Sequence, residues 1–399
     1  MNMKFATLGL ALVFTSLAAC APDATTEPAV ETPEVETPEA ETPAPPPPMR
    51  FFEAQQTYQT LGTVTGAQNP APIPRGETTD RLAEAVSYVE SMQSYAFIVW
   101  QGGEIVHEQY FAPHTSELRS ESASMHKSVL ALVVGAAIAD GHIASTQEPV
   151  STYIPEWRDD PRGAITIENL LQMNTGLKPL SYEGGAEAEA NKFNSGENVE
   201  ATILGLELVA EPNSVFHYAN TASQLLGIIV ERTSGLPYED YLAQRIWGPL
   251  GADDAYVYYN EVDRLPRTYS ALLARAEDWL RVGLLIKDDG MVNGEQIIPA
   301  DYIEAMTSPS STNPNYGYQV WLGTEFDPAR FYNDAKTGFA VTSSEPFATD
   351  DMIYFDGFGG QRVYISASQD LVIIRMGDVR FDWDDAKLPN LVIAALGEQ

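Results

Sequence analysis

The chain has 399 residues, 44% of them hydrophobic and 10% aromatic, which is typical of a globular protein with one large core or two modest ones. Its 56 acidic residues against 23 basic ones give a net charge of −33. A nucleic-acid-binding protein needs a basic face, so we expect no nucleic-acid partner. The five histidines lack metal-ligand spacing, Cys20 is the one cysteine, and no glycine-rich nucleotide fingerprint occurs. We therefore expect neither a metal site nor a cofactor.

The N-terminal segment predicts export. Lys4 precedes an apolar stretch, residues 5–17, that is too short to span a bilayer. Residues 17–20, Leu-Ala-Ala-Cys, resemble a bacterial lipobox. We expect residues 1–19 to be a lipoprotein signal peptide and Cys20 to carry a lipid anchor in the bacterial cell envelope, at the outer membrane or periplasm. An ordinary signal peptide cleaved before Cys20 is the alternative.

A change in composition divides the remaining chain. Residues 20–50 are rich in Pro, Glu, Thr and Ala, and such a segment cannot bury a core. We expect it to be a disordered acidic tether, extended by its own charge repulsion. Aromatic residues appear near its end, and residues 51–399 are expected to form the folded domain.

The first elements of the folded part are a helix and a hairpin. Apolar residues at helical spacing predict a helix over residues 79–92. Two β-rich runs, residues 94–100 and 104–110, are separated by Gln-Gly-Gly, which indicates a β-hairpin. A further apolar helix follows Ser124, and residues 146–260 are expected to be mostly helical or irregular.

The C-terminal part returns to strands. A helix is predicted over residues 272–286 and a last helix over roughly 386–396. Between them lie four predicted strands, at residues 318–322, 352–355, 362–366 and 371–376. This order predicts an α+β fold, an α/β sandwich in which one antiparallel sheet is flanked by helices and residues 146–260 form an inserted helical subdomain. A cleft between the two parts is the expected place for a site.

Ser124 and Lys127 form an S-x-x-K pair at the start of an apolar helix. Residues three apart share one helix face, so the hydroxyl and the amine are expected to meet. Serine becomes a strong nucleophile when a neighbouring base takes its proton, and lysine is such a base when its pKa is lowered. A bare S-x-x-K is common by chance, but this one opens a helix too apolar for the surface.

A second group is needed to share the proton of Lys127. Tyr218 and Asn220, in a Y-x-N pattern after a turn, are candidates for proton relay and for orienting the lysine or the substrate. Tyr258 and Asn260 fit the same pattern, so residue spacing alone leaves both open. The second pair lies in a β-like run, where tyrosines usually pack.

Acyl transfer also needs donors for the developing oxyanion. The amide of Ser124 is one candidate, and the glycine-rich segment 357–361 is another, because it lets a substrate approach the backbone at Gly360 and Gln361. A glycine-rich hairpin without chemistry is the alternative. Residues 336–338, Lys-Thr-Gly, match a motif of penicillin-recognising enzymes. We interpret them as a chance match, because no strand pattern surrounds them in residues 327–351.

Taken together, six segments in this order resemble the serine β-lactamase-like superfamily, which includes class C β-lactamases, penicillin-binding peptidases, family VIII esterases and 6-aminohexanoate-dimer hydrolases. The likeness covers about residue 94 to the C-terminus, and its order favours Tyr218 over Tyr258. The segments are residues 120–128, 165–177, 216–220, 247–251, 275–281 and 357–361.

The resemblance implies a β-lactamase/transpeptidase-like fold and roles for individual residues. Ser124 would be the acylated nucleophile, Lys127 its base, and Tyr218 a proton relay that also activates the deacylating water. The likeness is greatest to the 6-aminohexanoate-dimer-hydrolase branch, in which a loop tyrosine contacts the substrate amide. Tyr182 is the matching residue here.

One departure limits the range of substrates. Residues 358–360, Phe-Gly-Gly, stand where β-lactamases carry a lysine or histidine for the substrate carboxylate, and Arg362 lies near enough to replace it or to point away. We expect little β-lactamase activity and a serine hydrolase of small neutral or amine-bearing amides or esters, with no obligate protein partner. The alternatives are a D-amino-acid peptidase acting on peptidoglycan fragments and a catalytically silent binding protein.

Overall fold

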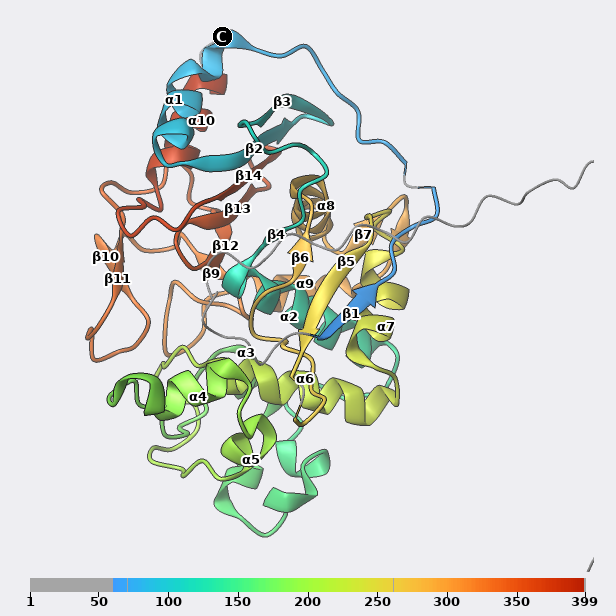
Figure 1. The fold of residues 1–399 in the computed structure, drawn as a ribbon, viewed down its shortest axis with the longest axis vertical. Coiled ribbons are helices and arrows are strands. Elements are labelled where there is room, and N and C mark those ends of the chain that lie inside the picture. Colours follow the sequence, from blue (N-terminus) through green and yellow to red (C-terminus); the bar gives the residue numbers. More distant parts are fainter. Residues whose placement is uncertain (1–59, 70, 261, 398–399) are drawn as a thin grey trace, which may run out of the picture. The chain divides into compact units, whose positions relative to one another are not determined.

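The computed structural model describes residues 60–69, 71–260 and 262–397, so the predicted signal peptide, Cys20 and the tether lie outside the described residues. Its largest sheet has six antiparallel strands in the order β3-β2-β14-β13-β12-β9 (Figure 1). The predicted N-terminal hairpin is confirmed, and it pairs with the C-terminal strands through β2 and β14. The strands are β2 (Ser94–Gln101), β3 (Glu104–Tyr110), β9 (Trp321–Leu322), β12 (Ile353–Gly357), β13 (Gln361–Ser366) and β14 (Leu371–Gly377).

Helices cover both faces of this sheet, as the sequence predicted. Alternating residues of β13 face opposite helices. Val363 faces Gly283 of one helix, where an added Cβ would lie 3.1 Å from Val363 Cγ1, so the close packing requires glycine. The next residue, Tyr364, lies on the other face and accepts a hydrogen bond from Trp383 Nε1 at 3.3 Å. The covering helices are α8 (Ala276–Lys287) on the first face, and α1 (Ala83–Ser91) and α10 (Lys387–Gly397) on the second.

A second antiparallel sheet, which the sequence did not predict, has the strand order β1-β5-β6-β4. Residues 273–274 pair in this sheet, so the helix predicted from residue 272 begins only at Ala276. The backbone at Ala271 is left-handed, with φ of +64°, and Asp278 accepts the N–H of Arg275 at the helix start. The strands are β1 (Thr60–Val64), β4 (Ser120–Glu121), β5 (Ala255–Tyr259) and β6 (Leu273–Ala274).

The middle of the chain is mainly helical, and α2 packs against α6 at its centre (Figure 1). Both helices bury long apolar runs, and α2 is buried from His126 to Ala137. The helices are α2 (His126–Ala139), α3 (Ile167–Leu171), α4 (Glu189–Ser195), α5 (Val199–Leu204), α6 (Asn220–Ser234), α7 (Tyr238–Leu242) and, later in the chain, α9 (Ala300–Met306).

Two short hairpins complete the described chain. β7 (Met291–Val292) pairs with β8 (Glu295–Gln296), and β10 (Ala329–Phe331) pairs with β11 (Ala340–Thr342). The interpretation that residues 327–351 lack strands was therefore wrong. Strands of three residues are too short to show a period-two pattern in the sequence.

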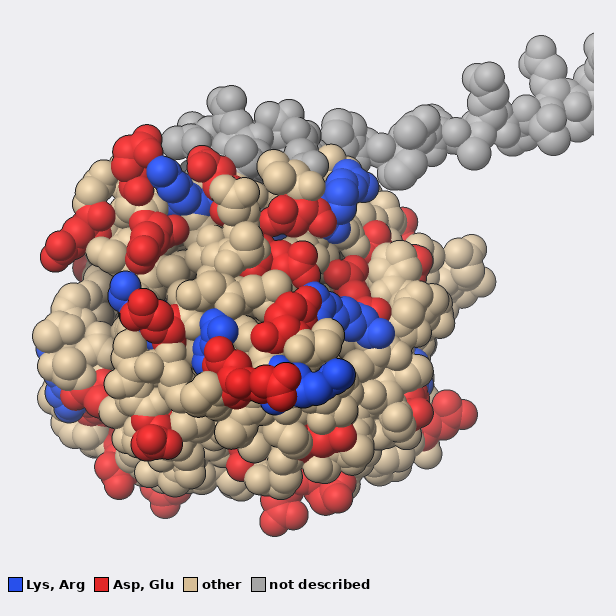
Figure 2. Space-filling model, turned by 90° about the horizontal axis from the view of Figure 1, so that it is seen from below, with Lys and Arg blue, Asp and Glu red and all other residues tan. Residues whose placement is uncertain are grey.

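Acidic side chains are spread over the face shown in Figure 2, and the basic side chains lie against them. Ion pairs of the described residues include Arg232 with Glu156 at 3.1 Å and with Glu200 at 2.8 Å. Within the part of the chain that the structure describes, no helix has both the length and the hydrophobicity needed to cross a membrane.

Candidate active site

Ser124 lies in a short 3₁₀ turn, η2 (Ala123–Met125), that leads directly into α2. The residue before it, Ala123, has φ of +48°, a left-handed conformation that costs free energy for any residue with a Cβ. A backbone hydrogen bond ties the turn to the segment just before β6, because Ala271 N–H donates to Ala123 O at 3.0 Å. The strained turn leaves Ser124 half-buried at the wall of a cavity.

Lys127 follows one helical turn later and is 1% exposed. Its Nζ lies 3.0 Å from Ser124 Oγ, 2.8 Å from Asn220 Oδ1 and 2.6 Å from the carbonyl oxygen of Tyr269. The oxygens of Asn220 and Tyr269 are acceptors only, whereas a serine hydroxyl also donates. A neutral amine therefore donates to those two oxygens and keeps its lone pair for the proton of Ser124.

The surroundings of Lys127 favour this neutral form. Burial lowers the pKa of Lys127 well below its usual value of 10.5, with Arg267 acting in the same direction and Asp356 against it. The ring of Tyr218 lies 4.9 Å from Nζ and helps to enclose the amine. The arrangement suits a lysine that accepts a proton at neutral pH.

Tyr218 completes the group around Ser124. It makes a side-chain hydrogen bond with Ser124, and burial raises its pKa well above 10, with a further increase from Asp356. The shifts of Lys127 and Tyr218 are opposite in sign, and both favour an amine and a phenol over an ammonium and a phenolate. The phenol can therefore donate a proton and later take it back.

The backbone around Tyr218 is fixed by two distant segments. Met173, at φ of +58°, accepts the N–H of His217 at 2.8 Å, and Tyr218 N–H donates to Tyr332 O at 2.9 Å. Met173 belongs to the segment 165–177, which begins with a capping box between Thr166 and Asn169. This segment, singled out in the sequence, holds Tyr218 in place rather than supplying a reactive group.

Ser124, Tyr218 and Asn220 line one cavity of about 570 Å³, and Tyr182 lies at its edge with 66% of its surface exposed. Asn194 Nδ2 lies 3.4 Å from Tyr182 Oη and also orients Asn220 through its Oδ1, 3.0 Å from Asn220 Nδ2. The structure therefore brings these predicted residues together. The cavity is also lined by residues that the sequence did not single out, among them Arg267, Tyr332, Phe339, Asp356 and Phe358.

Gly360 and Gln361, predicted to orient the substrate, do not line this cavity. Gln361 pairs with Gly357 inside the sheet, is fully buried, and its side chain is bonded to the backbone of Gly377. Gly360 lies against the ring of Trp383. The prediction of an oxyanion donor at Gln361 was wrong because the register of β12 and β13 uses its backbone within the ladder.

The two basic residues considered for the substrate carboxylate are also directed elsewhere. Arg362 is buried and pairs with Asp356 at 2.7 Å and with Asp385 at 2.7 Å. Lys336 is largely exposed and lies 3.4 Å from Asp327, although Thr337 and Gly338 of the same loop line the cavity. Neither residue is among those that line the cavity, so neither presents its charge to a substrate there.

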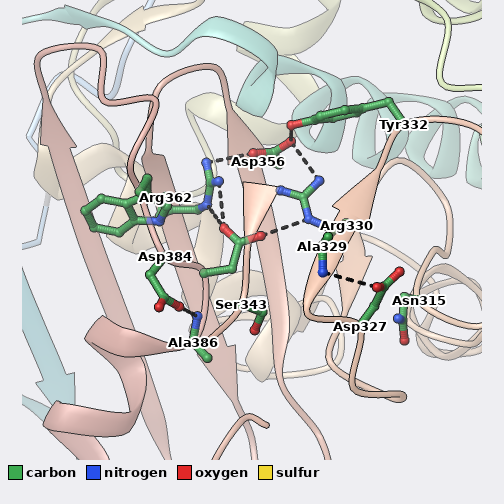
Figure 3. Close-up of polar contacts among 12 residues, drawn as sticks. Asn315, Asp327, Ala329, Arg330, Tyr332, Ser343, Asp356, Arg362, Asp384 and Ala386 are labelled. Atoms are coloured by element: carbon green, nitrogen blue, oxygen red, sulfur yellow. Dashed lines mark hydrogen bonds and ion pairs between the residues drawn. The ribbon is translucent and has the colours of Figure 1, made fainter. Parts of the chain in front are cut away.

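A buried ion cluster lies under the cavity floor and was not predicted (Figure 3). Asp356 of β12 accepts hydrogen bonds from Tyr332 Oη at 2.6 Å and from Arg330 Nη1 at 3.3 Å. Arg330 also pairs with Asp385 at 2.8 Å, and its guanidinium stacks on Trp321 at 4.1 Å. Two arginines lower the pKa of Asp356 despite its burial, so its carboxylate is charged and compensated.

His126 and Arg267 lie close to the reactive group. His126 Nδ1 is 3.0 Å from Ser270 O and Nε2 is 3.1 Å from Tyr238 Oη, and burial lowers its pKa to about 4. It is a neutral histidine that packs between Ser270 and Tyr238. Burial raises the pKa of Glu121 to about 7, and the positive charge of Arg267 opposes this rise. No group of three or more metal-ligating side chains occurs within residues 60–69, 71–260 and 262–397.

Comparison with known proteins identifies relatives for most of the chain. A family model described as beta-lactamase matches residues 80–396. The 6-aminohexanoate-dimer hydrolase of Paenarthrobacter ureafaciens is 25% identical over 246 residues, which are 58% of this chain and 61% of that protein. The match thus spans less than two thirds of this relative's length.

Solved structures show the same fold at low identity. A Bacillus anthracis protein provisionally assigned as a 6-aminohexanoate-dimer hydrolase gives a TM-score of 0.68 at 19% identity, covering 86% of this chain and 90% of that one. A family VIII carboxylesterase gives a TM-score of 0.57 at 16% identity, covering 81% and 99%. The predicted β-lactamase/transpeptidase-like fold, with antiparallel sheets and flanking helices, is confirmed.

Proposed function

This chain belongs to the beta-lactamase family, and we propose that it is a serine hydrolase cleaving small uncharged esters or amides through an acyl-enzyme. The observation that carries this proposal is the contact of Ser124 with Lys127 and Tyr218, in which the pKa of the lysine is lowered and that of the tyrosine raised. A nucleophile, a base and an acid thus meet at one cavity wall.

In the acylation step, Lys127 takes the proton of Ser124 while Oγ attacks the substrate carbonyl carbon. Tyr218 then donates its phenolic proton to the leaving alkoxide or amine, and regains a proton from Lys127. In the deacylation step, Tyr218 passes its phenolic proton to Lys127 as it accepts a proton from the attacking water. Lys127 then returns its proton to Ser124 Oγ, 3.0 Å away, which leaves as the hydroxyl. No metal or redox group enters either step.

The developing oxyanion needs two backbone donors. The N–H of Ser124 is one of them. Gly357 O is directed toward β13, where it accepts from Gly360 N and Arg362 Nη1. Successive strand residues direct their amides to opposite edges, so the N–H of Phe358 is directed to the edge that faces η2. We assign the second donor to Phe358 in place of Gln361.

The charged side chains at the bottom of the cavity favour an uncharged substrate. The charged residue that β12 presents to the cavity is Asp356, and Arg330 and Arg362 pair with it and with Asp385. A free substrate carboxylate would meet the carboxylate of Asp356, which costs binding free energy, whereas Arg267, which also lines the cavity, is only 1% exposed. We therefore expect neutral esters and amides to react faster than β-lactams or peptides ending in D-alanine.

The first experiment compares the full-length protein with Ser124→Ala on 4-nitrophenyl butanoate. Ser87→Ala, an exposed serine on α1, is the matched control. We expect turnover in the wild type and the control, loss in Ser124→Ala, and an acyl adduct on the Ser124 peptide by mass spectrometry. Equal activity in all three proteins, or an adduct on another residue, would contradict the proposal.

A further inference from the structure

Three phenylalanines meet at the mouth of the cavity. Phe339, Phe358 and Phe381 are 41%, 39% and 66% exposed. Their rings contact one another, with centroids 6.1 Å apart for Phe339 and Phe358, 5.9 Å for Phe339 and Phe381, and 5.6 Å for Phe358 and Phe381. Clustered apolar side chains at the surface of a chain with a net charge of −33 indicate a binding surface.

Further aromatic residues connect these phenylalanines to the reactive group. Tyr332 stacks on Phe339 at 6.2 Å with an angle of 16° between the rings, and it meets Tyr218 edge-on at 5.2 Å. Tyr332, Phe339 and Phe358 line the same cavity as Ser124. An unbroken aromatic track therefore runs from Tyr218 through Tyr332 to the three phenylalanines, which we call the aromatic mouth.

The three phenylalanines come from separate segments that are tied together. Phe339 precedes β11, Phe358 is in the turn between β12 and β13, and Phe381 lies between β14 and α10. Arg380 N–H donates to Gly359 O at 3.0 Å, which fixes the third segment to the turn. The aromatic mouth is thus placed by the backbone rather than by ring contacts alone.

Charges beside the aromatic mouth are paired among themselves. Arg380 and Asp382, which flank Phe381, form an ion pair at 2.6 Å, and Lys336 lies 3.4 Å from Asp327. Asp356 at the cavity floor is compensated by Arg330 and Arg362. These contacts leave apolar ring faces, rather than an unbalanced charge, for a ligand to meet.

We propose that the aromatic mouth binds a bulky uncharged group of the substrate, best an aromatic ring, whose ester or amide bond then lies at Ser124. This assignment rests on the proposed hydrolase function and names its substrate class. Continuity with the catalytic cavity favours a substrate over any other occupant, because a group held on Phe381 is linked to Ser124 through the same track. Aromatic contacts of this kind give selectivity of about 3- to 10-fold each.

The test uses the full-length protein and two substrate series, since the apolar group can belong to either side of the bond. The acyl series compares 4-nitrophenyl acetate with 4-nitrophenyl 4-phenylbutanoate. The alcohol series compares ethyl acetate with 3-phenylpropyl acetate, and their hydrolysis is measured by the release of acid. We expect Phe381→Ala to reduce the ratio of kcat/KM between the bulky and the small substrate about 3- to 10-fold in one series. Phe326→Ala, a phenylalanine 52% exposed and not among the residues that line the cavity, is the matched control and should change neither ratio.

A binding arm separates this inference from the hydrolase function. In the Ser124→Ala background, calorimetry of 4-phenylbutanamide should show binding that Phe381→Ala weakens about 3- to 10-fold, even if no ester is ever turned over. Unchanged ratios in both series together with unchanged amide affinity would overturn the proposal. Flotation of the Cys20→Ser chain with phosphatidylcholine vesicles that depends on Phe381, without any change in the ratios, would assign the aromatic mouth to a membrane surface instead.

Discussion

At the scale of single residues, the buried amine of Lys127 explains why this site can work near neutral pH. Its ordinary pKa of 10.5 falls because burial disfavours the ammonium form, and Arg267 adds to this effect while Asp356 opposes it. Its two acceptor contacts, Asn220 Oδ1 and Tyr269 O, hold the amine without taking its proton. The lone pair is thereby directed to Ser124, which is the contact that general-base catalysis needs.

Replacing Lys127 by Met, a side chain of similar length without a base, is expected to lower kcat about 10²- to 10⁴-fold. The difference in stability between wild type and the Lys127→Met variant should also depend on pH. Between its lowered folded pKa and 10.5, Lys127 is protonated only in the unfolded state, so its contribution to stability rises with pH in that window. The stability of the Met variant relative to wild type should therefore decrease by about 1 kcal/mol per pH unit there.

Urea unfolding from pH 7 to 10, beside initial rates on one ester, measures both effects of Lys127→Met. Lys178→Met, which removes a lysine charge from the edge of a neighbouring pocket, serves as the charge control. If Lys127→Met retained its kcat, or if its stability relative to wild type did not change with pH, a neutral base at this position would be ruled out.

The residues around Ser124 differ in how well the sequence could identify them. Ser124, Lys127 and Tyr218 belong to short patterns, and the structure brings them together, although their chemical roles stay predictions. Asp356 and Tyr332 reach the cavity only through long-range pairing, so no local spacing marks them. One signal was present for Asp356: it is an acidic residue that ends an apolar strand just before the glycine-rich turn.

At the scale of elements, the turn between β12 and β13 places Phe358 in the same cavity wall as Ser124. Gly359 and Gly360 have φ of +75° and +91°, a region that only glycine adopts without cost. A Cβ at Gly360 would lie 2.9 Å from Trp383 Cδ2, so the ring leaves no room for it. The turn therefore requires glycine for two reasons: its backbone is left-handed, and Trp383 packs against Gly360.

Gly360→Ala is expected to destabilise the domain by about 2–4 kcal/mol, because a left-handed backbone and a clash with a buried ring add up. Gly102→Ala is the matched control, since Gly102 has φ of +62° in the β2–β3 turn and open space around it. That variant should lose only the backbone cost, about 1 kcal/mol. Equal losses in urea unfolding would show that Trp383 yields without cost and that packing does not fix the turn.

The elements found from the sequence are those with several residues of regular pattern. The β2–β3 hairpin, the strands β12 to β14 and the helices α1, α8 and α10 all have such patterns. The second sheet was missed because β4 and β6 are two residues each, and their pairing joins Ser120 to Ala274. A contact between residues so far apart leaves no periodicity in either segment.

At the scale of the whole molecule, acidic groups set how stability depends on pH. Glu231 on α6 is partly enclosed, and burial raises its pKa from 4.5 to about 7, with Glu239 adding to the rise. Its Oε1 accepts the N–H of Tyr238 at 3.0 Å, a contact that a neutral side chain also makes. Between pH 4.5 and 7 the folded state therefore keeps a proton that the unfolded state has lost, and stability falls as pH rises through this window.

Glu231→Gln is expected to remove this decline, because the amide keeps an oxygen for Tyr238 and does not ionise. At pH 8 the variant should be more stable than wild type by about 1–3 kcal/mol, and at pH 4.5 the two should be nearly equal. Glu304→Gln on α9 removes one negative charge from an exposed position and controls for relief of the overall charge. An equal gain at both pH values, or an equal gain in the control, would place the effect in general charge repulsion rather than in the burial of Glu231, and thermal unfolding across this pH range decides between them.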